Sequence, residues 1–301
     1  MQADRSATHF AVLHQLTIAA AGVDHDRDRL HAIGTRDVVR KFHSLIVLVV
    51  VLVLEQFCAL FRSLQCLFSP LVSNCLVIFA KAPRLGTVKT RLQTTLPAGR
   101  VRKLYIAFVR DTLEMGRRVR KVDCRVIAFT PHDGEGLLRK AIGQDANGFE
   151  FVPQEGRDLG ERLRNAFAHS FQQGARRTVI IGSDSPSLPA RLVEEAFAAL
   201  AQNDLVLGPS TDGGYYLIGF RLQGSGFTVR ILDGIEWSTE RVLEQTVAAA
   251  RKAKLKTHLL TPWYDVDDAV TLRFLKTHLD ALAACGAIVL PTHSLKMLHA
   301  M

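Results

Sequence analysis

The sequence predicts an α/β protein with a mostly parallel sheet that binds its ligands at the carboxyl ends of the strands. Short apolar runs rich in β-branched residues alternate with longer amphipathic stretches from residue 76 onward, as strands alternate with crossover helices in α/β folds. The first run leads into a loop with three cations, and later runs end in aspartates. Because ligands bind at this edge of open α/β sheets, the charged residues fall where a site is expected.

Each expected element follows from its local pattern. Residues 76–80 form a continuous apolar run, which indicates a strand buried on both faces. Residues 98–120 carry apolar side chains near helical spacing, which indicates a long helix. The other expected strands are 124–129, 149–153, 178–182, 205–208, a strand after the glycine pair 213–214, and 257–260. The other expected helices are 135–142, a helix that ends near residue 173, 190–202, 237–253 and a final helix that ends at residue 284.

Three of these helices begin beside residues that can cap them. Asp158 is an expected N-cap, with Glu161 three residues further on. Ser238 or Thr239 is the expected cap of the helix 237–253, and Asp268 is the expected cap of the final helix.

The loop after the first strand combines Lys81, Lys89 and Arg91 with Pro83 and Gly86. A strand that ends in such a loop before a helix start predicts a site for an anionic, phosphorylated ligand. The loop has neither the glycine spacing of a P-loop nor the three glycines of the dinucleotide fingerprint, so both of those sites are excluded. A solvated basic loop is the alternative interpretation.

Aspartates follow several of the later strands. Asp184 ends the fourth strand and can ligate a hard divalent cation, or it can cap the next helix. Asp212 precedes two glycines and either faces a ligand or belongs to an ordinary turn. Asp265 and Asp267 alternate in an extended segment, so they can point the same way and share a cation. The indole of Trp237 is a candidate stacking surface.

Composition fits a globular, intracellular protein. The chain of 301 residues is 48% hydrophobic and 22% charged, and its net charge of +9 lies almost entirely after residue 74. A basic excess there is expected of a protein that binds nucleotides, nucleic acid or an anionic surface. The five cysteines form no C-x-x-C pair, which favours a reducing cytoplasm over a disulfide framework.

The N-terminal 71 residues carry no recognisable chemistry. Ten aliphatic residues at 45–54 would span about 15 Å as a helix, roughly half of a bilayer's hydrocarbon layer, and extension to residue 61 adds a glutamate. Residues 43–61 are therefore a candidate membrane contact, whereas the late position of the run disfavours a signal peptide. A start codon assigned too far upstream is a third hypothesis. We expect an extension at 1–71, a transferase domain at 72–285 and a C-terminal tail at 286–301.

Six segments together resemble a known family. In order they are FAKAPRLGTVKTRL, EGRDLGERL, IGSDSPSL, LGPSTDGGYYLIGF, IEWST and YDVDD. They resemble the rSAM/selenodomain-associated transferases, often labelled arsenosugar-biosynthesis-type glycosyltransferases, of the nucleotide-diphospho-sugar transferase (GT-A) superfamily. The resemblance covers about residues 75–284. The chain is similar, more distantly, to guanylyltransferases that activate 2-phospholactate or the molybdenum cofactor. One departure is Leu85, where the family pattern has proline.

The resemblance implies a three-layer α/β/α fold with a mixed, mainly parallel sheet, a nucleotide on the first loop, and Mg²⁺ or Mn²⁺ on the Asp184 motif. Asp267 is the second expected metal ligand. The residues expected at the nucleotide and its phosphates are Ala80, Lys81, Pro83, Gly86, Lys89, Thr90, Arg91 and Asp158. The residues expected at the sugar or acceptor are Gly213, Gly214, Tyr215, Trp237, Ser238 and Thr239.

The expected reaction is transfer of a sugar from a nucleotide-diphospho-sugar to a small acceptor, with Lys89 at the diphosphate and Asp212 orienting or deprotonating the acceptor hydroxyl. The same parts would serve a nucleotidyltransferase that joins an NTP to a phosphorylated small molecule, and the sequence does not separate the two. A non-catalytic nucleic-acid-binding module is an alternative. It is the minor one, because a surface that stacks bases needs aromatic residues interleaved with the cations, and this sequence does not have that pattern. The sequence gives no indication of an oligomeric state.

Overall fold

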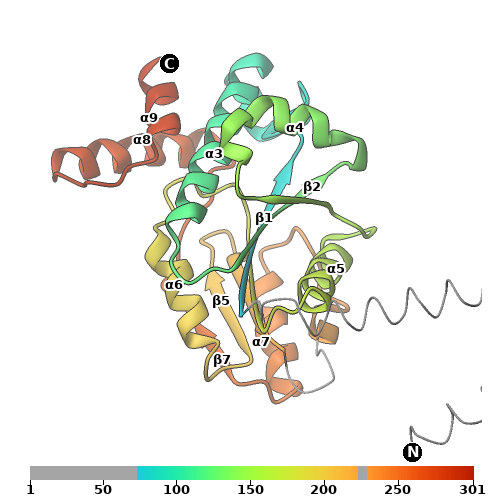
Figure 1. Cartoon of the computed structure of the whole chain (residues 1–301). Helices are drawn as coiled ribbons and strands as arrows, with labels where there is room; N and C mark the ends of the chain where they lie inside the picture. The colour runs from blue at the N-terminus through green and yellow to red at the C-terminus, as the bar shows by residue number, and fades with distance from the viewer. Residues whose placement is uncertain (1–72, 223–228) are drawn as a thin grey trace, which may run out of the picture. The chain divides into compact units, whose positions relative to one another are not determined.

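Strand β1 (Asn74–Lys81) lies in the interior of the sheet in the computed structural model, which describes residues 73–222 and 229–301 (Figure 1). Its parallel neighbours are β2 (Cys124–Thr130) and β4 (Arg177–Ile181). Leu76 and Ile78 pack into an apolar cluster on one face of β1, and Val77 packs into another cluster on the opposite face. Burial on both faces explains why the sequence of β1 is continuously apolar, and it confirms that prediction.

The sheet is mixed and mainly parallel, as expected. In the described part of the chain its strand order is β3-β2-β1-β4-β6-β5-β7. Strand β3 (Glu150–Pro153) is parallel to β2, and β7 (Thr257–Leu259) is parallel to β5 (Leu205–Pro209). Strand β6 (Tyr215–Arg221) is antiparallel to both β4 and β5, because the short turn that links β5 to β6 reverses the chain.

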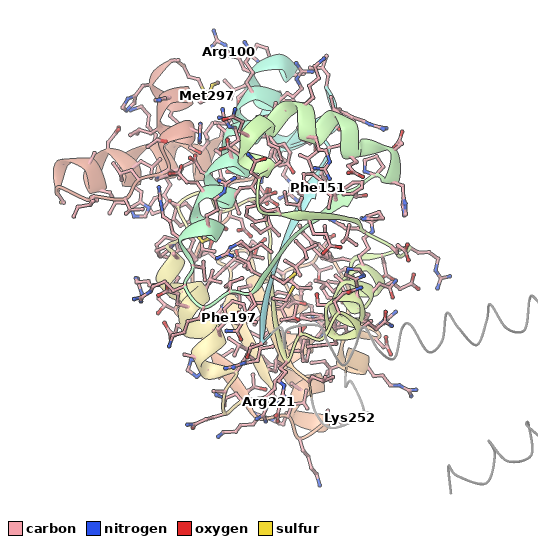
Figure 2. All side chains as sticks on the ribbon, in the orientation of Figure 1. Arg100, Phe151, Phe197, Arg221, Lys252 and Met297 are labelled. Carbon is pink, nitrogen blue, oxygen red and sulfur yellow. The ribbon has the colours of Figure 1, made fainter. Side chains whose placement is uncertain are left out.

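Helices cover both faces of the sheet. Helices α3 (Ala98–Arg118), α4 (Glu135–Ile142) and α6 (Ala190–Ala199) pack into one apolar cluster, to which the labelled Phe197 of α6 belongs (Figure 2). Helices α5 (Leu159–Gln172) and α7 (Val242–Lys252) pack into the cluster on the other face. The arrangement is the three-layer α/β/α architecture that was expected. Short 3₁₀ turns are η1 (Thr90–Thr94), η2 (His132–Gly134), η3 (Gly143–Ala146) and η4 (Val229–Leu232).

Two helices follow β7, where the sequence predicted one. Helix α8 (Ala269–Ala284) begins at Asp268, whose carboxylate accepts hydrogen bonds from two backbone N–H groups, so the predicted cap is confirmed. Helix α9 (Thr292–His299) lies in the segment expected as a tail. Both helices pack beside α3 in a third apolar cluster, against which Met297 rests (Figures 1 and 2). The prediction that α8 is the final helix is therefore wrong.

Helix α7 begins at Val242 rather than at residue 237, so the predicted capping by Ser238 or Thr239 is wrong. Ser238 has φ 65°, a left-handed conformation outside the helical region. The Thr239 hydroxyl donates to the carbonyl of Glu236 at 2.7 Å and closes a turn before the helix. The predicted cap at Asp158 is confirmed, since its carboxylate accepts the backbone N–H of Glu161 at 2.8 Å.

Within the described ranges, no helix has the length and apolar character needed to cross a bilayer. The candidate membrane contact at 43–61 and the hypothesis of an upstream start codon concern residues that lie outside those ranges.

Candidate active site

A lysine lies between two carboxylates at the carboxyl edge of the sheet. Lys89 Nζ is 2.6 Å from Asp184 Oδ1 and 2.8 Å from Asp267 Oδ1. Lys89 comes from the loop after β1, Asp184 from the loop after β4 and Asp267 from the segment before α8. Because β1 and β4 are parallel neighbours, their following loops meet at one edge. Three of the predicted site residues are thus in contact.

The Lys89 side chain is 5% exposed, whereas those of Asp184 and Asp267 are 47% and 41% exposed. Burial favours the neutral amine and so acts to lower the pKa of Lys89, whereas the two carboxylates favour the ammonium and act to raise it. Together the carboxylates outweigh burial, so the pKa of Lys89 lies above its ordinary value. Lys89 is therefore a buried ammonium whose charge depends on its acidic partners.

Asp265 is a partly buried residue beside this group. It accepts hydrogen bonds from the Ser185 hydroxyl and, at 3.1 Å, from the Ser210 hydroxyl. Burial raises the pKa of Asp265 to about 6, and the nearby charges of Asp184 and Asp212 add to the increase. The sequence predicted that Asp265 could share a cation with Asp267, but in the structure the two carboxylates contact different partners.

The loop after β1 is tied to the helix that follows it. The backbone N–H of Lys81 donates to the Tyr105 hydroxyl of α3 at 2.7 Å, and that hydroxyl lies 3.3 Å from the Ser183 hydroxyl. Burial raises the pKa of Tyr105 to about 12, so the phenol stays protonated at neutral pH. Tyr105 therefore links the β1 and β4 loops. The sequence gives no signal for this role, because Tyr105 occupies an ordinary apolar position of an amphipathic helix.

Within this loop, Ala80 and Pro83 are buried, whereas the side chains that could meet a ligand are exposed, namely those of Lys81, Thr90 and Arg91. Gly86 has φ +80° and open space where a Cβ would lie. Leu85, which replaces the proline of the family pattern, is 60% exposed. Arg84 forms an ion pair with Asp133 at 2.5 Å, which connects this loop to the one after β2.

Asp212, Gly213 and Gly214 form the tight turn between β5 and β6. The Asp212 carboxylate accepts the backbone N–H of Gly214 at 3.0 Å. Gly213 has φ +88°, and a Cβ there would lie 2.1 Å from the carbonyl oxygen of Glu240. Only glycine fits this position. The turn is therefore fixed against the chain that leads into α7, with the Asp212 side chain exposed and its charge felt by Asp265.

Trp237 and Tyr215 pack together beneath this turn. Their rings meet edge to face with centroids 6.4 Å apart, and both side chains contact the apolar cluster under α5 and α7. A Cβ on Gly160 would lie 2.6 Å from Trp237 Nε1, so the indole also rests on the first turn of α5. The structure therefore assigns Trp237 a packing contact between α5 and β6.

A second acidic cluster lies away from this edge. One ligand atom from each of Asp111, Glu114 and His293 falls within 4.8 Å of the others, a spacing that could hold a metal ion. The Asp111 oxygens, however, already accept the backbone N–H groups of His293 at 3.0 Å and Ser294 at 2.7 Å. Asp111 therefore caps the N-terminus of α9.

The family model described as "Uncharacterized protein conserved in bacteria (DUF2064)" matches residues 115–239. No curated protein matches the chain. Among solved structures, a protein from Desulfovibrio desulfuricans described as a candidate nucleotide-diphospho-sugar transferase is 33% identical, with a TM-score of 0.67. The match covers 75% of this chain and 94% of that one.

A second solved structure is 4-diphosphocytidyl-2C-methyl-D-erythritol synthase from Anaerococcus prevotii, which is 11% identical with a TM-score of 0.47. That match covers 69% of this chain and 96% of the other. The expected fold of nucleotide-diphospho-sugar transferases is confirmed by the 33% identical structure and by the strand order.

Proposed function

The chain belongs to the DUF2064 family, and from this premise we propose that it is a metal-dependent transferase that uses a nucleotide-activated donor. The group transferred is a sugar, which passes from a nucleotide-diphospho-sugar to the hydroxyl of a small acceptor. The description of the 33% identical relative supports this choice. The resemblance of six motifs to the rSAM/selenodomain-associated transferases supports it as well.

The observation that carries the proposal is the contact of Lys89 with both Asp184 and Asp267 at the carboxyl edge of the sheet. This edge is where open α/β sheets bind ligands. It combines a cationic loop, suited to a diphosphate, with two carboxylates, suited to a divalent cation. A diphosphate donor needs both kinds of group.

Asp184 and Asp267 would hold the divalent cation, Mg²⁺ or Mn²⁺. Carboxylate oxygens are ligands that both ions accept, and here one oxygen of each already contacts a single positive charge. When bound, the ion supplies charge that offsets the negative charge developing on the departing nucleotide diphosphate.

The chain's own residues perform the remaining tasks. The diphosphate is faced by three exposed side chains of the first loop, those of Lys81, Thr90 and Arg91, and Gly86 gives it access to the backbone. Two buried residues, Ala80 and Pro83, shape that loop from beneath. Asp158 flanks the diphosphate at the start of α5. Asp212 orients the acceptor hydroxyl and accepts its proton. The rigid glycine turn at Gly213 and Gly214 holds Asp212 in place, with Tyr215, Trp237, Ser238 and Thr239 forming the adjoining wall.

Thermal shift measurements on the full chain test this proposal. The ligands are UDP, GDP, CDP and dTDP sugars and the four NTPs, each with and without Mn²⁺. A ligand at a hundred times its dissociation constant stabilises by about 2.7 kcal/mol, roughly 5 to 10 °C here. We expect an Mn²⁺-dependent shift with one nucleotide sugar, followed by transfer to an acceptor alcohol.

Asp184→Asn should abolish the Mn²⁺-dependent part of the shift, whereas Asp280→Asn, a surface change on α8, should leave it intact. A shift with an NTP alone, and pyrophosphate release with a phosphorylated acceptor, would replace sugar transfer by nucleotidyl transfer. No shift with any nucleotide would remove the proposal.

A further inference from the structure

We propose that Lys89 competes with the divalent cation for Asp184 and Asp267, so that the metal ion enters when a nucleotide phosphate gives Lys89 a new partner. The inference rests on the proposed function, because it assumes a donor whose phosphates reach this edge. It goes beyond that function by assigning an order to the binding of nucleotide and metal.

The geometry puts the lysine where the metal ion would have to be. Lys89 Nζ contacts Asp184 Oδ1 at 2.6 Å and Asp267 Oδ1 at 2.8 Å, so one ammonium bridges one oxygen from each carboxylate. A cation that bridges Asp184 Oδ1 and Asp267 Oδ1 would have to take the place of the ammonium. The two occupants therefore exclude each other at these atoms.

The charge balance also favours exchange over joint occupancy. Two carboxylates offer two negative charges, of which the ammonium neutralises one. A divalent ion added beside the ammonium would bring the local charge to three positive against two negative, with the like charges at close range. Once the ammonium leaves, the two carboxylates match the divalent ion.

The backbone allows the lysine to leave. Lys89 has φ 47° and ψ 49°, a left-handed conformation that is unfavourable for a residue with a Cβ. The ion pairs of Lys89 with the two aspartates stabilise this conformation, so the backbone of Lys89 can relax once those pairs are lost. Gly86, at φ +80° in open space, lies three residues before it in the same loop. Lys81 at the end of β1 and Arg91 in η1 flank this loop and are exposed, and a phosphate bound by them would offer the Lys89 ammonium a new partner.

The competition is tested on the full chain by titration with Mn²⁺, in which the electron paramagnetic resonance signal of free Mn²⁺ measures how much is bound. The variants are Lys89→Met and, as a matched control, Lys81→Met, which removes a cation from the same loop. Without nucleotide, we expect wild type to bind Mn²⁺ weakly, Lys89→Met to bind it at least tenfold more tightly, and Lys81→Met to change the affinity by less than threefold.

Addition of UDP, GDP or CDP to wild type should then tighten Mn²⁺ binding at least tenfold, and the same addition to Lys89→Met should have a much smaller effect. The double variant Lys89→Met/Asp267→Asn should lose the gain in affinity, which ties the gain to these carboxylates. Circular dichroism melts establish that each variant is folded. If Lys89→Met fails to fold, Lys89→Gln takes its place.

Equal Mn²⁺ affinity of wild type and Lys89→Met without nucleotide would overturn the competition and leave the proposed function standing. A gain of equal size in Lys81→Met would also overturn it, because a general charge effect would then be enough. If Lys89→Met gains affinity but no nucleotide alters Mn²⁺ binding in wild type, the exchange at the two carboxylates holds and the nucleotide is overturned as its trigger. The thermal shifts then decide the proposed function separately.

Discussion

The Asp265 carboxylate accepts a hydrogen bond from the Ser210 hydroxyl at 3.1 Å, in a position where burial raises the pKa of Asp265 to about 6. An ordinary aspartate has a pKa near 3.8. Between these two values the folded protein holds a proton that the unfolded chain has released. The free energy of unfolding must therefore fall as pH rises through this window.

For Asp265 alone we expect a loss of about 3 kcal/mol between pH 4 and pH 7, since each pKa unit corresponds to about 1.4 kcal/mol. Urea denaturation of wild type and Asp265→Asn across this range, with chelator present, measures it. The difference between the two stability curves should change by that amount. Parallel curves for Asp265→Asn would show that its carboxyl group titrates normally.

Gly213 offers a test of the rigid turn beside Asp212. A Cβ at this position meets the Glu240 carbonyl oxygen at 2.1 Å, and φ is +88°. Gly213→Ala should therefore cost about 3 kcal/mol of unfolding free energy, from the left-handed conformation and the clash together. Gly234→Ala is the matched control, because its φ is +75° but nothing lies within 4 Å of its Cβ. It should cost only about 1 to 2 kcal/mol. Equal losses in urea denaturation would mean that the turn can move away from Glu240.

Local patterns predicted most of the fold. The apolar runs at β1 and β4 predicted strands because both are buried on two faces. Asp158 and Asp268 were recognisable as caps because a cap bonds to N–H groups within three residues. Helix α9 was missed because it has eight residues and its N-terminus is capped by Asp111, more than 180 positions earlier. No sequence pattern within residues 292–299 indicates that Asp111 caps this helix.

The site was predictable as a list of residues but not as a set of contacts. Lys89 and Asp267 were each singled out by residue type and position, yet they lie 178 positions apart in the sequence, and their ion pair exists only through the order of the strands. Trp237 was singled out as a candidate stacking surface for its indole ring. Its contact with Gly160 depends on how α5 lies against β6, which no periodicity encodes.

Tyr105 should be needed to hold the first loop in its ligand-ready shape. In Tyr105→Phe the backbone N–H of Lys81 loses its hydrogen-bond acceptor, which should cost about 1 to 2 kcal/mol of stability. The affinity for whichever nucleotide the thermal shifts identify should fall several-fold, because the loop residues no longer start in position. Tyr216→Phe is the control, since that hydroxyl donates at 2.9 Å to Thr261 in another part of the sheet. Isothermal titration should show a weaker nucleotide affinity in Tyr105→Phe alone. The same loss in both variants would indicate general destabilisation.

The cluster of Asp111, Glu114 and His293 should behave as a helix cap and not as a metal site. Asp111→Ala leaves the first N–H groups of α9 without their acceptor and frees the helix from α3, so we expect a loss of about 2 kcal/mol in unfolding free energy. Glu114→Gln should change stability by less than about 0.5 kcal/mol, because Glu114 pairs with Arg118 on the surface of α3. Chelator should not alter the melting temperature of wild type or of either variant. If chelator lowered it in wild type, and Glu114→Gln removed that effect, a structural metal ion at these three side chains would replace the cap as the explanation.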